Sequence, residues 1–275
     1  MSMWRNLRGS AILHLKRVRH QMRIRSAARS EGGEEWTPLF IVSQPRTGST
    51  YLQELLDSIP AVTMTGEVLS VTLPIGIRSS ASAATSLGHI QQSLQALPGR
   101  IRGAKFLIDQ MQLHDVTLDH LKQHFPNAKY LILYRQSILE EIVSFRVARE
   151  TNQWVGRNGA KYKFTGQVRI APDDLKKHFD REQEKYAEVL VHDWLRDCAA
   201  IVSYEGLVES PQAVFESTIC PLLGIPHSVV ASSMTKQMSR PMSDGVENFD
   251  ELEPHLDACT LNLEWEPAEA HANVV

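Results

Sequence analysis

The 275-residue chain is 43% hydrophobic and 22% charged, the composition of an ordinary globular protein with one large α/β domain or two small ones. It has no run of about eighteen apolar residues, which argues against a membrane-spanning helix. Its three cysteines are far apart and form no C-x-x-C pair, which argues against a zinc knot or a disulfide framework and fits a reducing, cytoplasmic compartment.

Charge is distributed unevenly along the chain. Residues 1–30 contain eight arginine or lysine side chains and no acidic one. Because the net charge of the whole chain is −3, subtracting these +8 charges leaves −11 on the remaining residues. This acidic body argues against general nucleic-acid binding.

The first predicted element is a basic amphipathic helix, which together with a short linker occupies residues 1–35. Its apolar side chains recur at spacings of three and four residues, and they are Trp4, Leu7, Ala11, Leu15, Val18 and Met22. Such a helix could lie on an anionic membrane, dock on a partner subunit, act as a targeting peptide or pack on the body of its own chain. The sequence leaves these four roles open.

From residue 36 onward, the pattern alternates between strands and helices. The predicted strands are 39–42, 62–66, 104–108, 130–134 and 200–204. The predicted helices begin near residues 51, 118, 138, 172 and 211, and the last two open with a proline. Because strands separated by helices form parallel sheets, we expect a three-layer α/β fold in which helices flank a central parallel sheet.

The segment 43–50, with the sequence SQPRTGST, joins the first predicted strand to a helix. A strand, a tight loop and a helix N-terminus form an anion site, because the first N–H groups of the helix have no internal partner. Gly48 allows the backbone to approach an anion closely, Ser49 and Thr50 add hydroxyl donors, and Arg46 adds a fixed positive charge. The loop therefore predicts a phosphate-binding site.

This loop is not a Walker A motif, because it lacks the first glycine and the lysine of G-x-x-x-x-G-K-[ST]. A nucleoside triphosphatase also needs an aspartate at the end of a later strand to hold magnesium. Here the strand 130–134 ends in Arg135. A cation in that place favours an anionic ligand that is bound without a metal.

Five blocks of sequence, in the same order, resemble the sulfotransferases that use 3′-phosphoadenosine 5′-phosphosulfate (PAPS). They are QPRTGSTYLQELL (44–56), GEVL (66–69), KYLILYRQSILEEIVSFRVARETNQW (129–154), YEGLVESP (204–211) and KQMSRPMSDGVENFDEL (236–252). The likeness is stronger to the nodulation-factor sulfotransferases of bacteria than to the trehalose sulfotransferases. It implies a P-loop-like domain over residues 36–275 that moves a sulfuryl group from PAPS to an acceptor hydroxyl.

The resemblance assigns a set of residues to the cofactor: Arg46, Thr47, Gly48, Ser49, Thr50, Tyr51, Arg135, Ser144, Tyr204, Lys236 and Arg240. Residues 46–50 would hold the 5′-phosphosulfate, and the two tyrosines would contact adenine. The arginine and serine of the third block would bind the 3′-phosphate. The last two residues would lie in a late polar loop that folds over the cofactor.

Two of these assignments depart from the common pattern of the family. Arg135 and Ser144 are nine residues apart, whereas many relatives have an interval of eight, so Ser137 is an alternative to Ser144. Arg46 stands where many relatives have lysine. An arginine does not lose its proton and so cannot act as a general acid. The resemblance therefore implies only that Arg46 stabilises negative charge.

Sulfuryl transfer also needs a base for the acceptor hydroxyl, and the candidate is Glu67 at the end of the second predicted strand. The resemblance supports it, because the trehalose-type enzymes are thought to use a glutamate in a similar Gly-Glu setting. His114 is the rival, since histidine is the commonest general base. Lys105 matches a lysine of the nodulation-type proteins and is expected near the transferred group, as is Arg46.

Two other functions compete with sulfuryl transfer. One is a P-loop kinase or other nucleotide-binding protein, and the other is a non-catalytic nucleotide-binding module tethered by the N-terminal helix. The acceptor follows from the resemblance alone, which implies a carbohydrate or a glycolipid. The segments 70–103 and 155–175 depart most from the family and are expected to build the acceptor pocket.

Overall fold

The computed structural model of the protein describes residues 35–77, 79–154, 164, 166–234 and 240–265. The predicted basic helix with most of its linker, and Lys236 of the late polar loop, lie outside the described residues. Among the helices of the described ranges, none combines the length and the apolar character that crossing a bilayer needs.

Five parallel strands form one sheet in the order β2-β3-β1-β4-β5. The strands are β1 (Thr37–Ser43), β2 (Val62–Glu67), β3 (Ile101–Leu107), β4 (Lys129–Tyr134) and β5 (Ala199–Ser203). The sheet confirms the predicted α/β class. Because β1 lies at the centre and its neighbours β3 and β4 come later in the chain, the direction of winding changes beside β1. Ligands of doubly wound sheets bind at such a point, beyond the carboxyl ends of the strands.

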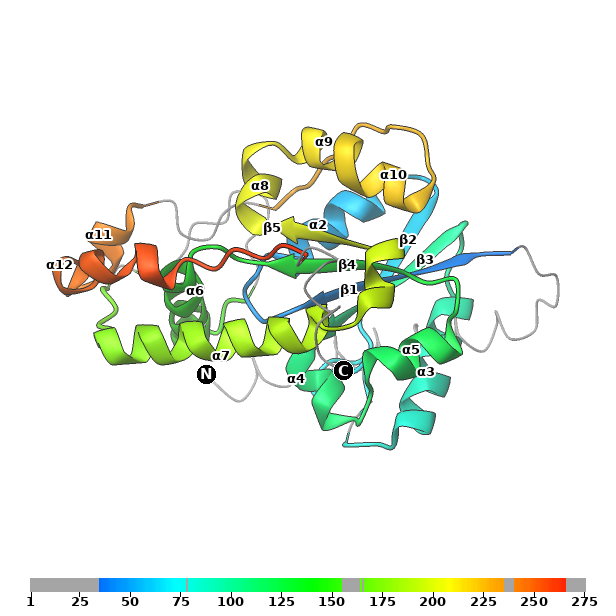
Figure 1. Ribbon diagram of the computed structural model, residues 1–275, viewed down its shortest axis with the longest axis horizontal. Coiled ribbons are helices and arrows are strands. Elements are labelled where there is room, and N and C mark those ends of the chain that lie inside the picture. Colours follow the sequence, from blue (N-terminus) through cyan, green and yellow to red (C-terminus); the bar gives the residue numbers. More distant parts are fainter. Residues whose placement is uncertain (1–34, 78, 155–163, 165, 235–239, 266–275) are drawn as a thin grey trace, which may run out of the picture.

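Helices cover both faces of the sheet (Figure 1). They are α2 (Ser49–Asp57), α3 (Ala83–Gln95), α4 (Ile108–Leu113), α5 (Leu118–His124), α6 (Ile138–Thr151), α7 (Pro172–Leu190), α8 (Tyr204–Glu209), α9 (Pro211–Val214), α10 (Cys220–Leu223), α11 (Met242–Gly245) and α12 (Phe249–Leu252). The other helical segments are the π-helical η2 (Phe215–Ile219) and three 3₁₀ helices, η1 (Asp193–Asp197), η3 (Glu253–His255) and η4 (Asp257–Cys259). In Figure 1, α3, α5 and α7 lie on one side of the sheet and α2, α8, α9 and α10 on the other.

The central strand β1 divides the core in two because successive side chains of a strand point to opposite faces. Phe40 and Val42 belong to the cluster formed with α3, α5, α6 and α7. Leu39 and Ile41 belong to the cluster formed with α2, α8 and η2. All four side chains are fully buried. Each contributes about 1.5–3 kcal/mol of hydrophobic free energy, which fixes the strand that carries the phosphate loop.

Local signals explain where the helices near the loop begin. The hydroxyl of Ser137 accepts the N–H of Glu140 and caps α6, which ends at Asn152 in the left-handed conformation. Pro172 occupies the first turn of α7. The nineteen-residue α7 then runs along the sheet, packed against α6.

The structure differs from the predicted elements in several places, and α4, α11 and α12 had no predicted counterpart. Helix α3, capped by Ser82, lies in a segment for which no element was predicted. The fifth strand ends at Ser203 rather than Tyr204, because the Ser203 hydroxyl accepts the N–H of Gly206 and starts α8. The helix that Pro211 opens is divided into α9, the π-helical η2 and α10.

Candidate active site

The phosphate loop has the backbone shape of an anion site. Gly48 precedes the first turn of α2 with a φ of 86°, and Arg46 has a φ of 69°. Successive residues in such conformations direct their N–H groups to one side of the loop. The free N–H groups at the N-terminus of α2 are directed in the same way, toward a bound anion. A Cβ atom on Gly48 would lie 2.2 Å from Cδ2 of Tyr204, so the tyrosine ring packs directly on the loop.

The beginning of the loop is fixed from the protein interior. The Thr47 hydroxyl donates to the carbonyl of Gln44 at 2.8 Å. The N–H of Gln44 donates to the Tyr186 hydroxyl at 3.2 Å, and that hydroxyl donates to the carbonyl of Leu133 at 2.7 Å. The Thr47 side chain is fully buried. The Thr47 side chain therefore stabilises the loop, and only the backbone of Thr47 is available to contact a phosphate.

A cavity of about 210 Å³ opens beside the loop. It is lined by Arg46, Gly48, Ser49, Thr50, Tyr51, Arg135, Glu140, Ser144, Trp154, Tyr204, Val208, Met234 and Met242. We refer to it as the first cavity. Eight of the eleven residues that the resemblance assigns to the cofactor meet here, although they come from segments more than 150 residues apart.

Arg135 is the most constrained cation of the first cavity. Its Nη1 donates to the carbonyl of Arg46 at 3.1 Å, and its Nη2 is paired with Glu140. Its Nε lies 4.0 Å from Oε1 of Glu205 and has no hydrogen-bond partner among the described residues. The guanidinium also lies over the Tyr204 ring, at 4.6 Å from the centroid. A buried guanidinium with an unused donor suits an additional anionic ligand.

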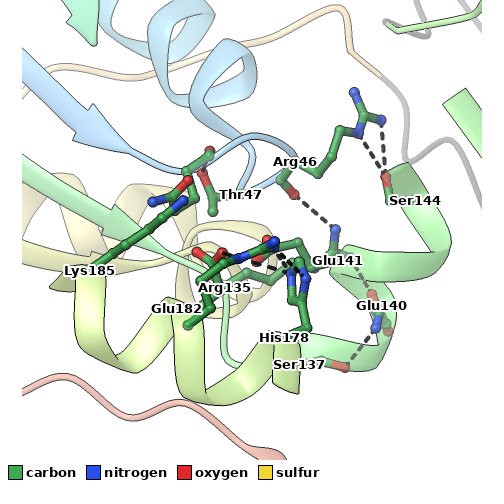
Figure 2. Close-up of polar contacts among 12 residues, drawn as sticks. Arg46, Thr47, Arg135, Ser137, Glu140, Glu141, Ser144, His178, Glu182 and Lys185 are labelled. Carbon is green, nitrogen blue, oxygen red and sulfur yellow. Dashed lines mark hydrogen bonds and ion pairs between the residues drawn. The ribbon is translucent and has the colours of Figure 1, made fainter. Parts of the chain in front are cut away.

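Arg46 lines the first cavity and is held against α6. Its Nε and Nη2 donate to the Ser144 hydroxyl at 3.1 and 3.0 Å, and its Nη1 donates to the carbonyl of Trp154 at 2.8 Å. Figure 2 shows the guanidinium above α6, next to Ser144. Ser137 does not line this cavity, since its hydroxyl caps α6. The structure thus places Ser144, and not Ser137, beside the two arginines.

Two tyrosines give the first cavity flat walls. Tyr204 contacts both Gly48 and Arg135, and Tyr51 follows the loop in the first turn of α2. Burial raises the pKa of the Tyr204 phenol, although Arg135 partly opposes the shift. Burial also raises the pKa of the Tyr51 phenol. Both rings therefore stay neutral at physiological pH and can stack on a planar base.

Glu67 is placed by a β-bulge. In the pairing of β2 with β3, Met64 lies opposite Gly103 and Glu67 lies opposite Lys105, so β2 contains one extra residue. Gly66, with a φ of 95°, adopts the left-handed conformation that the bulge requires. Bulges re-aim side chains beside functional sites, and this one puts the Glu67 carboxylate next to the lysine of the neighbouring strand.

Lys105 connects Glu67 to the phosphate loop. Its Nζ lies 3.0 Å from Oε1 of Glu67 and donates to the Thr50 hydroxyl at 3.0 Å. Gln110 donates to the second carboxylate oxygen at 2.9 Å. Each carboxylate oxygen still has a free lone pair, and the Glu67 side chain is 20% exposed, so a hydroxyl from solvent can reach it.

His114 has a different environment. It has no exposed surface, and both ring nitrogens have backbone partners. Its Nδ1 accepts the N–H of Ala81 at 3.2 Å, so its Nε2 donates to the carbonyl of Leu69 at 2.9 Å. This histidine ties the segments before α3 and after β2 to α4. It has neither a free lone pair nor access to a substrate.

Arg240 lies apart from the other predicted residues. Its guanidinium donates to the carbonyl of Gly166 and lies over the Phe164 ring, and it does not line the first cavity. Sequence reasoning missed Glu140, Glu205 and Gln110, which hold Arg135 and Glu67 in place. No motif identifies these three, because each acts through a contact that only the folded chain creates.

Comparison with known proteins identifies the family. A profile described as "Sulfotransferase family" matches residues 38–86 and 79–228. Nodulation protein H of Rhizobium meliloti (strain 1021) is 25% identical over 227 residues, which cover 80% of this chain and 91% of the relative. Among solved structures, a sulfotransferase from Alicyclobacillus acidocaldarius matches with a TM-score of 0.49 and 12% identity over 82% of this chain and 93% of that chain. Sulfotransferase STF9 from Mycobacterium avium matches with a TM-score of 0.49 and 13% identity over 90% of this chain and 82% of that chain.

The profile covers more than half of the chain, and its span includes the phosphate loop, Glu67, Arg135 and Tyr204. It confirms the predicted resemblance, the enzyme class and PAPS as the sulfuryl donor of that class. It does not favour the two alternatives, a P-loop kinase and a non-catalytic nucleotide-binding module. The chain belongs to the sulfotransferase family.

Proposed function

We propose that this sulfotransferase transfers the sulfuryl group of PAPS to a hydroxyl of a carbohydrate or glycolipid, with Glu67 as the base. The observation that carries the proposal is the contact chain from Glu67 through Lys105 to Thr50, which joins a carboxylate to the N-terminus of the phosphate-binding helix. PAPS supplies an activated sulfuryl group. All other roles belong to residues of the chain.

The cations and aromatic walls of the first cavity support PAPS as its ligand. The N-terminus of α2, Ser49, Thr50 and Arg46 would hold the 5′-phosphosulfate. Arg135 and Ser144 would hold the 3′-phosphate, and the unused Nε of Arg135 supports this assignment. The neutral rings of Tyr51 and Tyr204 would contact adenine. Lys236 and Arg240 remain proposed cofactor contacts in the late loop, although Arg240 has other partners here.

Glu67 would accept the proton of the attacking hydroxyl at a carboxylate oxygen. Lys105 keeps that carboxylate next to the loop and places a positive charge where negative charge develops on the transferred group. The burial of His114 and the hydrogen bonds of both its ring nitrogens support Glu67 over His114 in this role. Attack in line with the leaving phosphate, without a metal, would then need only positioning and charge stabilisation.

The carbohydrate acceptor is supported by the resemblance to the bacterial carbohydrate sulfotransferases and by the similarity to Nodulation protein H. It can be tested with ³⁵S-labelled PAPS and a panel of chitotetraose, cellotetraose, trehalose and an alkyl glucoside. 4-Nitrophenol and a serine peptide serve as hydroxyls of other classes. We expect label on at least one carbohydrate. Label only on the other hydroxyls would overturn the proposed acceptor class.

We also propose that residues 4–22 bind an anionic membrane surface, which would place the enzyme at the periphery of a membrane. The support is the sequence alone, which combines an apolar stripe with a cationic flank. Deletion of residues 1–30 should abolish binding to phosphatidylserine vesicles and spare turnover of a soluble acceptor. Loss of an oligomer or of folding on deletion would instead assign the segment to a partner subunit or to the chain's own body.

A further inference from the structure

A second cavity, of about 570 Å³, borders the phosphate loop and shares no lining residue with the first. Helix α6 separates them. Glu140 and Ser144, four residues apart, line the first cavity, whereas Glu141 and Phe145, also four apart, line the second. Residues four apart lie on one face of a helix, so the two cavities lie against neighbouring faces of α6. Gln44 at the start of the loop contributes to the second.

The second cavity has no excess of charge. Four carboxylate residues and four arginines or lysines line it. Most are paired with one another: Arg146 with Asp174 at 3.7 Å, Arg181 with Glu182 at 3.4 Å, and Lys185 with Asp109. The remaining carboxylate, Glu141, accepts from His178. The remaining cation, Lys177, has no ion pair among the described residues, and its charge is balanced within the lining by that of Glu141. Because the lining as a whole carries no net charge, it favours a neutral polar ligand.

Two buried polar atoms of this cavity have no partner among the described residues. Nε2 of Gln44 is a donor and Oε2 of Glu182 is an acceptor, and the two residues are only 1% and 2% exposed. An unsatisfied buried polar atom costs about 1–3 kcal/mol, so such atoms mark places where a ligand or water binds. A hydroxyl group both donates and accepts, and a ligand rich in hydroxyls would satisfy both atoms.

The cluster Glu141, His178 and Glu182 also has the composition of a metal site, with ligand atoms within 4.8 Å of one another. Its hydrogen bonds oppose that use. Nη2 of Arg181 lies 2.6 Å from Nδ1 of His178, and because arginine has only donors, Nδ1 must accept. The His178 proton is then on Nε2, which points to Glu141 at 3.2 Å. The nitrogen that faces the carboxylates thus has no lone pair for a metal (Figure 2).

An exposed aromatic pair stands between the cavities. Phe145 lines the second cavity and Trp154 the first, and their rings meet edge to face at a centroid distance of 5.9 Å. The two side chains are 40% and 45% exposed. Exposed rings beside hydroxyl-binding groups provide the apolar surface that the C–H face of a sugar ring can cover.

The second cavity is also connected to the base. Asp109 lines it, and the next residue of α4, Gln110, donates to Glu67 at 2.9 Å. An acceptor held between α4, α6 and α7 would therefore lie near both the phosphate loop and the Glu67 carboxylate. Of the two segments where the acceptor pocket was expected, 155–175 contributes Asp174 to this cavity, whereas no residue of 70–103 lines it.

We infer that the second cavity is the acceptor subsite and that it takes an electrically neutral oligosaccharide, with Gln44 and Glu182 binding its hydroxyls and Phe145 its ring face. This inference rests on the proposed function. It specifies the substrate class further, because a lining without net charge favours neutral sugars over charged ones.

The test measures binding of tetrasaccharides to the PAP-bound, full-length chain by saturation-transfer NMR titration, where PAP is the desulfated product of PAPS. The probes are the neutral chitotetraose and cellotetraose, a cationic chitosan tetramer and an anionic tetragalacturonate. We expect a neutral probe to bind at least about tenfold more tightly than the charged ones. Glu182→Gln and Gln44→Met should each weaken it about tenfold and leave PAP affinity unchanged. Glu184→Gln, an exposed change on the same helix, is the matched control.

The outcomes separate this inference from the proposed function. In one outcome, label is transferred to a carbohydrate, but neither Glu182→Gln nor Gln44→Met changes tetrasaccharide binding. That result would overturn the cavity assignment and leave the proposed function intact. In another outcome, label is transferred only to 4-nitrophenol or the serine peptide, while the tetrasaccharides bind as predicted. That result would overturn the acceptor class and leave the cavity as a sugar site. Tighter binding of a charged probe, or no binding of any probe, would overturn the inference.

Discussion

The two cavities on either side of α6 are built in different ways. The first is built around one run of neighbouring residues, since five of its thirteen lining residues lie between positions 46 and 51. The second is formed by packing α6 against α7, and the loop contributes only Gln44 and Pro45. Local backbone shape thus determines the proposed donor site, whereas long-range packing determines the proposed acceptor site.

The two cavities also differ in how their charges are arranged. In the first, an arginine donor is left without a hydrogen bond, beside a helix N-terminus. In the second, most charged groups are paired, and the buried atoms without a partner among the described residues are one amide donor and one carboxylate oxygen. The difference indicates an anionic ligand in one cavity and a neutral polar ligand in the other.

The largest effect should come from the proposed base. Glu67→Gln keeps the shape of the side chain and removes its charge, so turnover should fall about 10²–10⁴-fold, the usual contribution of a positioned base. PAP affinity should stay nearly constant, because Glu67 does not line the first cavity. Steady-state kinetics with labelled PAPS and calorimetry with PAP measure the two quantities.

His114→Ala provides the contrast. Removing this ring leaves the N–H of Ala81 and the carbonyl of Leu69 without partners, which should cost about 1–3 kcal/mol of stability. The folded fraction should keep most of its turnover. If Glu67→Gln retains turnover and His114→Ala loses it in folded protein, the base is misassigned.

Gly48→Ala should damage the first cavity and leave the second intact. The new Cβ would collide with the Tyr204 ring, and alanine tolerates the positive φ poorly. PAP affinity should fall about 10–100-fold, while tetrasaccharide binding to the unliganded chain changes less than about twofold. Gly224→Ala is the matched control, since Gly224 also has a positive φ, of 61°, but has open space around it. Equal loss of both ligands would show that the cavities are not independent.

The smallest effect concerns stability at different pH values. Burial and the neighbouring Glu141 raise the pKa of Glu182 to about 7, against the lowering influence of His178, Lys185 and Arg181. A raised carboxyl pKa means that the folded state holds the proton more tightly than the unfolded state. Glu182 therefore destabilises the fold progressively as pH rises from about 4.5 to about 7.

Glu182→Gln should remove this penalty. The free energy of unfolding of this variant minus that of wild type should be about 1–2 kcal/mol larger at pH 8 than at pH 5. Urea denaturation of both proteins at the two pH values measures this difference. Glu184→Gln, on the exposed side of α7, should show no such difference. Parallel pH profiles for Glu182→Gln and wild type would show that this carboxyl titrates normally.

The sequence predicted the fold and the first cavity because both depend on local signals. The apolar runs of β1 and β4 and the glycine of the loop have direct structural consequences, and the resemblance added Arg135, Ser144 and Tyr204. The bulge that aligns Glu67 with Lys105 was not predicted, since register depends on the neighbouring strand. Of the two segments in which the acceptor pocket was expected, only 155–175 contributes to the second cavity, through Asp174, because contacts between α6 and α7 leave no motif.

The central claim, that the first cavity binds the 3′-phosphorylated nucleotide, is tested most directly by calorimetry of PAP against adenosine 5′-monophosphate, with EDTA present. The two ligands differ only in the 3′-phosphate, which is assigned to Arg135 and Ser144. PAP should bind more tightly by about 2–4 kcal/mol, which is about 30–1000-fold. Equal affinities would contradict the assignment and with it the account of the first cavity.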